Sequence, residues 1–287
     1  MSNISQINTN LQALQGQSSL NKVNSKLGDT QLQLSTGLRI NRAEDDAAGF
    51  SIASKLTSRI EGLDQASRNI GDAKSVLDIA ETGLNSIMDI LVDVKSKAVQ
   101  GANDTLGDTE RGFIKDQVDA LVAEIDEISA STTFQGIELL AGDGAGAALD
   151  LTFQVGEASG DTLTVSIAQT TADQFGAAAG DFTTAVTALD AAHSTTFNRL
   201  LDDVDAAIEG LAGQFNQLGI DQTKLSIREE NVDQAINSNS AARSRIQDAD
   251  FAKVQSESIR LQILQQTATS ALAQANSSPQ SVLGFLG

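Results

Sequence analysis

The chain has 287 residues, with 38 acidic and 19 basic side chains, so its formal net charge is −19. It contains no cysteine, which excludes disulfides and zinc–thiolate sites. We expect no nucleic-acid partner, because phosphate binding needs a basic face. The start of the chain lacks a basic and then apolar signal segment, and no run of about 20 apolar residues occurs, so we expect neither a cleaved signal nor membrane insertion.

Charge is absent from both ends of the chain. Residues 1–21 and 261–287 carry no charged side chain, and no Lys or Arg occurs between Asp116 and Asn198. The ends are therefore suited to burial, whereas the acidic middle is suited to solvent. A strongly acidic chain repels its own copies, except where its surface lacks charge.

Apolar residues at helical spacing open the chain. Two short stripes contain Ile4, Ile7, Leu11 and Leu14, then Leu20, Val23, Leu27 and Leu34. We expect amphipathic helices here, each with one apolar face to bury.

A dense group of charges follows in the stretch LSTGLRINRAEDDAAGFSIASKL, residues 34–56. Gly37 is placed to end a helix in the left-handed conformation. Asp45 and Asp46 precede a new helical pattern, where acids cap a helix and favour its positive end. With Arg39, Arg42 and Glu44 they predict a charged joint between two helices.

The longest periodic pattern comes next. Its apolar members alternate in steps of three and four: Leu63, Ala66, Ile70, Ala73, Leu77, Ala80, Leu84, Ile87, Leu91, Val94 and Ala98. This seam predicts a coiled-coil helix about 50 Å long. After a break at 103–112, Ile114, Val118, Leu121, Ile125 and Ile128 predict a helix that doubles back. Residues 201–236 repeat the spacing, interrupted at Gln222 and Glu229.

Between these helical patterns the spacing of apolar side chains changes. Residues 149–155 and 162–167 alternate apolar and polar side chains around a glycine-containing turn, which predicts a β-hairpin. Residues 175–196 are small and polar, and we expect them to form a solvent-facing excursion.

A second charged segment precedes the final helical pattern. It contains Arg243, Arg245, Asp248 and Asp250, at a distance from the end similar to that of the first group from the start. If the chain folds back on itself, the two groups meet, and we expect ion pairs or hydrogen bonds between them, within one chain or between neighbours. The final apolar stripe places Phe251, Val254, Leu261, Ala268, Leu272 and Ala275 on one face. Leu264, Val282 and Leu283 are further candidates for burial at this end of the chain.

No chemical site can be assembled from the remaining candidates. His193 is the chain's one histidine and has no metal or nucleophile motif around it. The glycine-containing stretch 142–147 lacks the Lys-Ser/Thr of a phosphate loop, so we interpret it as a flexible connection. Asp202, Asp203, Asp205 and Glu209 fit a solvated helix face better than a calcium site. We therefore expect no enzyme activity, cofactor or metal.

Several long motifs resemble bacterial flagellin. LSTGLRINRAEDDAAGFSIASKL, QASRNIGDAKSVLDIAETGLN and TTFQGIELL are similar to its amino-terminal half. SRIQDADFAKV and LAQANSSPQSVLGFLG are similar to its carboxyl-terminal end. The resemblance covers residues 1–140 and 200–287 in the family's order.

The resemblance implies a mainly α fold, an elongated antiparallel helical bundle or coiled coil built from both termini, with a small β-hairpin and a short central insert. It implies the following parts: inner core helices at 1–35 and 251–287; a spoke at 36–45 with its partner element at 243–250; outer helices at 46–140 and 196–242; and the hairpin with a short variable insert at 141–195.

The resemblance also implies a function. The expected role is that of a structural subunit that self-assembles into the flagellar filament used for motility. The expected partners are other copies of the chain, an export chaperone, the type III export apparatus, and the filament cap and hook–filament junction proteins. The expected location is the flagellum outside the cell, reached without a cleaved signal. The alternative is a hook–filament junction protein. A metalloprotease insert is disfavoured by the absence of HExxH, and a membrane-acting helical effector by the acidity.

One family motif is degenerate here. Flagellins present Gln-Arg-Val-Arg-Glu-Leu-Ala-Val-Gln to a vertebrate innate immune receptor, and the matching residues are 92–100. Asp93 stands in place of the first Arg, Lys95 in place of the second, and Lys97 in place of the Leu. The charge reversal at Asp93 predicts weak activation of that receptor.

Overall fold

The computed structural model describes residues 9–143, 147–174, 182–190 and 193–283, without the side chains of 278–283. It contains two compact units. The terminal unit joins Met1–Ile60 to Asn237–Gly287, and the central unit is Glu61–Ile236. Helices α2 and α5 each run from one unit into the other.

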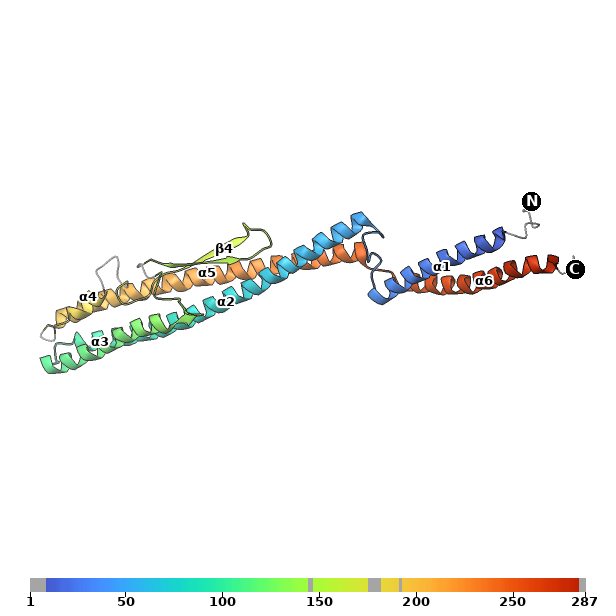
Figure 1. The fold of residues 1–287 in the computed structure, drawn as a ribbon. Helices are drawn as coiled ribbons and strands as arrows, with labels where there is room; N and C mark the ends of the chain where they lie inside the picture. The colour runs from blue at the N-terminus through green and yellow to red at the C-terminus, as the bar shows by residue number, and fades with distance from the viewer. Residues whose placement is uncertain (1–8, 144–146, 175–181, 191–192, 284–287) are drawn as a thin grey trace. The chain divides into compact units, whose positions relative to one another are not determined.

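Helices dominate both units (Figure 1). In chain order the elements are α1 (Leu11–Thr36), α2 (Ala47–Gly101), α3 (Asp108–Ser131), β1 (Thr133–Phe134), β2 (Ile137–Glu138), β3 (Leu149–Gln154), β4 (Thr162–Ile167), α4 (Phe182–Thr187), α5 (Ser194–Gln247) and α6 (Phe251–Leu283). The prediction of a mainly α fold with a small hairpin is confirmed.

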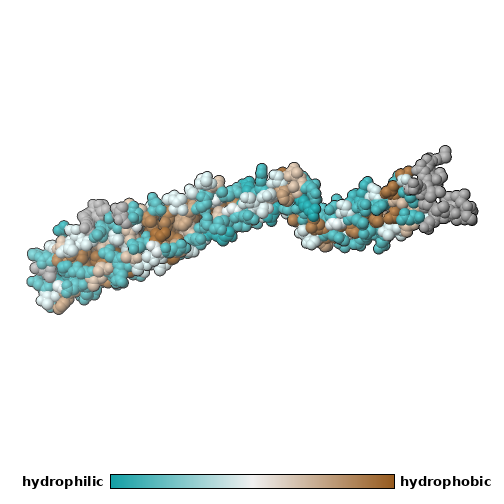
Figure 2. All heavy atoms as spheres, in the orientation of Figure 1, coloured by the Kyte–Doolittle hydropathy of each residue, from teal (hydrophilic) through white to brown (hydrophobic). Residues whose placement is uncertain are grey.

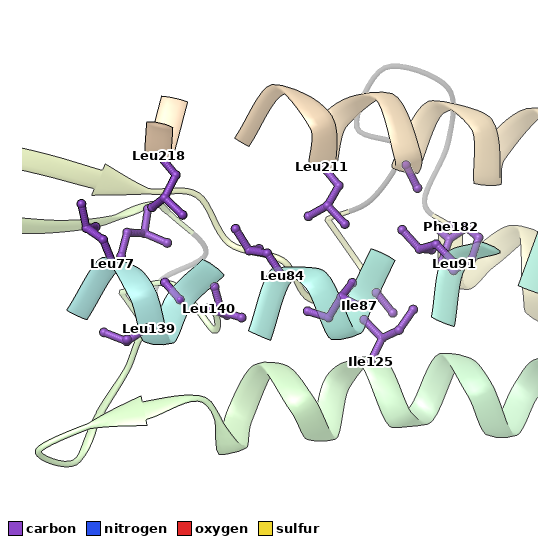
Figure 3. Packing of buried hydrophobic residues seen from close by; sticks show 14 of the residues in the cluster. Leu77, Leu84, Ile87, Leu91, Ile125, Leu139, Leu140, Phe182, Leu211 and Leu218 are labelled. Carbon is purple, nitrogen blue, oxygen red and sulfur yellow. The ribbon is translucent and has the colours of Figure 1, made fainter. Parts of the chain in front are cut away.

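The core of the central unit is built along α2. All eleven residues of the predicted seam, from Leu63 to Ala98, are buried. Figure 3 shows α2 between its two neighbours, with Ile125 of α3 on one side and Leu211 and Leu218 of α5 on the other. A seam that is buried by two helices explains why its spacing continues without a break.

Polar residues fix how α2 and α5 are aligned. Glu229 interrupts the apolar spacing of α5 because it forms an ion pair with Lys74 of α2. Gln222 interrupts it for the same reason: its Nε2 donates to Glu81 Oε2 over 2.8 Å. Sliding one helix along the other would break these pairs, so they specify the register that the apolar seam alone leaves open.

The turn from α2 to α3 is closed by a buried guanidinium. Arg111 Nε donates to the carbonyl of Gly101 and its Nη2 to that of Asn103, both over 3.1 Å. The carbonyl of Gly101 lies at the end of α2, where the helix no longer supplies partners, and that of Asn103 lies in the turn that follows. Arg111 therefore gives the end of α2 a side-chain donor and ties α3 to the turn between the two helices.

The predicted hairpin is confirmed, and a second one was not predicted. Strands β3 and β4 pair antiparallel, with Leu149 opposite Ile167. The short strands β1 and β2 also pair, through a turn at Gln135 and Gly136 whose φ angles are 49° and 82°. Two successive positive φ angles are the requirement of a tight hairpin turn, which glycine satisfies without strain.

The expectation of a solvent-facing excursion over 175–196 is wrong for residues 182–189. The side chains of Phe182, Val186 and Leu189 are buried, and α4 packs on α3. The chain has ten Phe and neither Trp nor Tyr, so burying Phe182 removes one of its few large rings from water. Residues 175–181 and 191–192 of this stretch lie outside the described residues.

Two helical glycines give a matched test of this packing. A Cβ added at Gly101 would lie 2.4 Å from the buried ring of Phe197, whereas one at Gly71 would meet nothing within 4 Å. We expect Gly101→Ala to lower the free energy of unfolding by about 1–3 kcal/mol through overpacking. Gly71→Ala should raise it by about 0.5–1 kcal/mol because alanine favours the helix. Urea denaturation followed by circular dichroism measures both, and equal effects would contradict the packing described.

Candidate subunit interface

The two charged segments of the terminal unit meet through their backbones. Arg39 N–H donates to the carbonyl of Gln247 over 2.6 Å, and Ala249 N–H donates to that of Gly37 over 2.9 Å. Leu38 and Asp248 thereby form an antiparallel bridge. Gly37 has a φ of 73° and ends α1, which turns the chain toward Gln247.

Side chains add two further bonds across this joint. The guanidinium of Arg39 donates to the carbonyl of Ile246, and Gln247 Nε2 donates to that of Ile40 over 3.4 Å. Ile40 itself is buried. The joint is thus a short backbone ladder with an apolar side chain beneath it.

The acidic side chains of each charged segment bond to groups within the same segment. Asp46 Oδ1 accepts from Gly49 N–H over 2.9 Å and caps α2, and Asp250 Oδ1 accepts from Lys253 N–H over 3.1 Å and caps α6. Glu44 forms an ion pair with Arg42 over 2.8 Å. Asp248 accepts from the hydroxyl of Ser244 one turn earlier.

The two charged segments are therefore joined mainly by backbone hydrogen bonds. Among the described residues of a single chain, no ion pair links residues 39–46 to residues 243–250. Arg243 and Arg245 form no ion pair there. Ion pairs between neighbouring chains stay a prediction. Sequence reasoning missed Gln247, because a residue that acts through its carbonyl leaves no side-chain signal.

Asp45 organises the loop before α2. One of its carboxylate oxygens accepts from the N–H groups of Asn41 and Arg42, each over 2.9 Å. These bonds to the charged form lower the pKa of Asp45, with a smaller contribution from the charge of Arg42. The ordered loop is thus coupled to the ionised carboxylate.

This coupling predicts a pH dependence. Because the pKa of Asp45 is lowered in the folded chain, its contribution is present above the ordinary carboxyl pKa and is lost as pH falls through the lowered value. We expect a carbon-13 titration of the Asp45 carboxyl to have its midpoint below that of an unfolded peptide. The amides of Asn41 and Arg42 should lose exchange protection over the same range. The Asp45→Asn variant is the control, and unchanged protection in that variant would contradict the coupling.

Helices α1 and α6 lie side by side and antiparallel in the terminal unit (Figure 1). Asn10 Nδ2 donates to the carbonyl of Ala275, and Gln265 Nε2 donates to Asn24 Oδ1, both over 2.8 Å. The large apolar residues of the two terminal stripes differ in exposure. Leu27 and Leu261 are buried, and Leu34 and Leu272 are partly buried; Leu11, Leu14, Phe251 and Leu264 are exposed.

The pair therefore satisfies one apolar stripe and leaves another in water. Figure 2 shows hydrophobic surface on this pair among the hydrophilic residues. Two helices cannot bury all sides of both, so the exposed leucines need a further partner. Ile4 and Ile7 lie outside the described residues, as do the side chains of Val282 and Leu283.

The remaining candidates gather no chemical site. His193 Nδ1 lies 2.7 Å from Asp190 Oδ2 on the surface. Asp205 forms an ion pair with Lys95, and burial raises the pKa of Asp203. In the described part of the chain, no cluster of His, Cys, Asp or Glu is suited to hold a metal ion. Over the same residues, no helix has the length and apolar character needed to cross a membrane.

Comparison with known proteins identifies the family. Residues 7–145 match the bacterial flagellin N-terminal helical region, and residues 201–286 match the C-terminal helical region. Flagellin of Bacillus subtilis is 37% identical, and flagellin of Halalkalibacterium halodurans is 35% identical; each match covers 98% of this chain and 99% of the relative. Flagellin FlaB1 of Treponema pallidum is 34% identical with the same coverage. The chain belongs to the bacterial flagellin family.

Proposed function

We propose that this chain is the structural subunit that polymerises into the bacterial flagellar filament, outside the cell. The observation that carries the proposal is the α1–α6 pair, whose helices leave Leu11, Leu14 and Leu264 in water. Neighbouring copies in a filament supply the missing burial. The flagellin names of the relatives favour this role over that of a hook–filament junction protein.

The parts of the chain divide the work of assembly. Residues 1–35 and 251–287 form the filament core, 36–45 with 243–250 form the spoke, and 46–140 with 196–242 form the outer rods; 141–195 hold the hairpin and a short insert. The support for this division is the distribution of charge. Residues 1–21 and 261–287 are uncharged, so they can be buried without an unpaired ion.

The apolar faces of the terminal helices also bear on how the chain is exported and assembled. The chain leaves the cell through the type III export apparatus without a cleaved signal, and a chaperone covers its apolar terminal helices until then. The filament cap and the hook–filament junction proteins receive it. The uncharged part of α6 from Leu261 onward, with Ile263 and Leu264 exposed, supports this route, because an apolar surface needs cover before assembly.

Truncation tests the filament role. Deleting 261–287 removes most of α6 but leaves the core of the central unit intact. We expect the truncated chain to remain folded and monomeric and to form no filaments. Sedimentation and negative-stain microscopy after seeding measure this, with the full-length chain as control. Filaments from the truncated chain would contradict the proposal.

The degenerate receptor motif, residues 92–100, lies in the last turns of α2. Asp93 is exposed, Lys97 is partly buried, and Lys95 forms an ion pair with Asp205 of α5. An acid at position 93 repels what an Arg would attract, and the ammonium of Lys95 is already engaged within the chain. These features support weak recognition by the vertebrate flagellin receptor.

Reverting the motif tests this reading. Loss of an interface arginine costs about 2 kcal/mol or more, which is roughly 30-fold in affinity. We expect the wild-type monomer to activate receptor reporter cells poorly, and Asp93→Arg with Lys97→Leu to restore activation at least about tenfold. Ile137→Leu, on the short hairpin, serves as a neutral control. Potent activation by the wild-type chain would refute the prediction.

A further inference from the structure

The β3–β4 hairpin lies beside α5 (Figure 1), and a cavity of about 230 Å³ separates its turn from that helix. Apolar side chains form much of the cavity wall: Leu63 of α2, Val155 just after β3, and Val232 and Ala235 of α5. An engineered apolar cavity of about 150 Å³ in another protein holds one benzene molecule, so this cavity has room for an organic molecule of about eight non-hydrogen atoms.

The hairpin turn is fixed by α2 and by its own side chains. Asn69 Nδ2 of α2 donates to the carbonyl of Gln154 over 3.1 Å. Asp161 Oδ2 accepts from Ala158 N–H over 3.1 Å within the turn. In the described part of the chain, no hydrogen bond links Gly156 or Asp161 to α5. The turn therefore keeps its shape and its place without using the donors that α5 offers.

Two side chains of α5 bring those unused donors to the cavity. Arg228 and Asn231 line it, are exposed, and form no hydrogen bond or ion pair among the described residues. One turn earlier, Lys224 is paired with Asp221 over 2.8 Å. The chain has 38 acidic and 19 basic side chains, so a shortage of acids does not explain an unpaired arginine. A guanidinium presents a planar fork of donors that matches a carboxylate, and the amide adds further donors.

We propose that this cavity binds a small organic monocarboxylate. The carboxylate accepts hydrogen bonds from Arg228 and Asn231, and the apolar chain of the ligand lies against Leu63 and Val232. A single negative charge suits the site, because Asp161 also lines the cavity and a dianion would be repelled more strongly. All of these residues belong to one chain, so the site needs no neighbouring copy and does not depend on the proposed filament function.

A titration of the free subunit with hexanoate tests the proposal. Gly156 and Gly160 line the cavity, so their backbone amide signals in heteronuclear NMR spectra report on its occupancy. We expect both signals to shift and to saturate in the millimolar range, as suits a ligand of few atoms. Absence of a saturable shift would overturn the proposal.

Related probes separate the two halves of the site. Hexylamine keeps the apolar chain and reverses the charge, whereas acetate and inorganic phosphate lack the chain. We expect each of them to bind at least tenfold more weakly than hexanoate. Equal binding of hexylamine would overturn recognition of the carboxylate, and equal binding of acetate or phosphate would overturn the role of the apolar wall.

Removing the guanidinium tests its assignment. Arg228→Gln should weaken hexanoate binding at least tenfold, because the charged donor fork is lost. Arg199→Gln is the matched control, since Arg199 is also an exposed arginine of α5 but does not line the cavity. Circular dichroism verifies that both variants are folded. Unchanged binding by Arg228→Gln, or equal weakening by both variants, would overturn the proposal.

Filling the cavity gives an independent readout. Ala235→Leu adds an isobutyl group at the cavity wall and should abolish the hexanoate-dependent shifts. Ala212→Leu, at an exposed position of the same helix, should bind as the wild-type chain does. Hexanoate binding by Ala235→Leu with wild-type affinity would place the ligand outside the cavity and overturn the proposal.

Discussion

Burial of the α2 seam between α3 and α5 is the interaction on which the central unit depends. Residues such as Leu77, Leu84 and Ile87 are fully buried, and each large aliphatic side chain removed from water contributes about 1.5–3 kcal/mol. Apolar contact has no preferred register, so the polar partners Lys74–Glu229 and Gln222–Glu81 supply one. Stability and alignment thus come from different side chains along the same pair of helices.

The terminal unit depends more on backbone hydrogen bonds and less on apolar burial than the central unit does. Its joint uses backbone bonds between Gly37, Arg39 and the Gln247 region, which many side chains would tolerate. Its two helices bury Leu27 and Leu261 but leave other apolar positions in water. A helix pair with so narrow a core draws little stability from tertiary packing. Additional burial in a polymer is the physical reason for a sequence without charges at both ends.

The sequence predicted the parts that depend on periodicity and failed where structure depends on the main chain or on sparse apolar residues. The α2 seam was predicted residue by residue and the bounds of the β3–β4 hairpin to within one residue, because their side chains repeat at fixed spacing. The β1–β2 hairpin was missed because its strands are two residues long and its signal is confined to Gln135-Gly136. Phe182 was misplaced because a single ring amid small residues gives no periodic pattern. At the candidate interface, the sequence indicated that the two charged segments meet, but it could not identify the carbonyl acceptors through which they do so.

Hydrogen–deuterium exchange of the free subunit and of the filament tests most directly whether the central unit is self-sufficient and the terminal pair depends on assembly. We expect the amides along the α2 seam, from Leu63 to Ala98, to be strongly protected in both states. Amides of α1 and α6 should exchange rapidly in the free subunit and gain protection by at least two orders of magnitude in the filament, since partner burial is then added to a marginal helix pair. Equal protection of α1 and α6 in both states would show that the pair needs no neighbour, which would contradict its dependence on assembly.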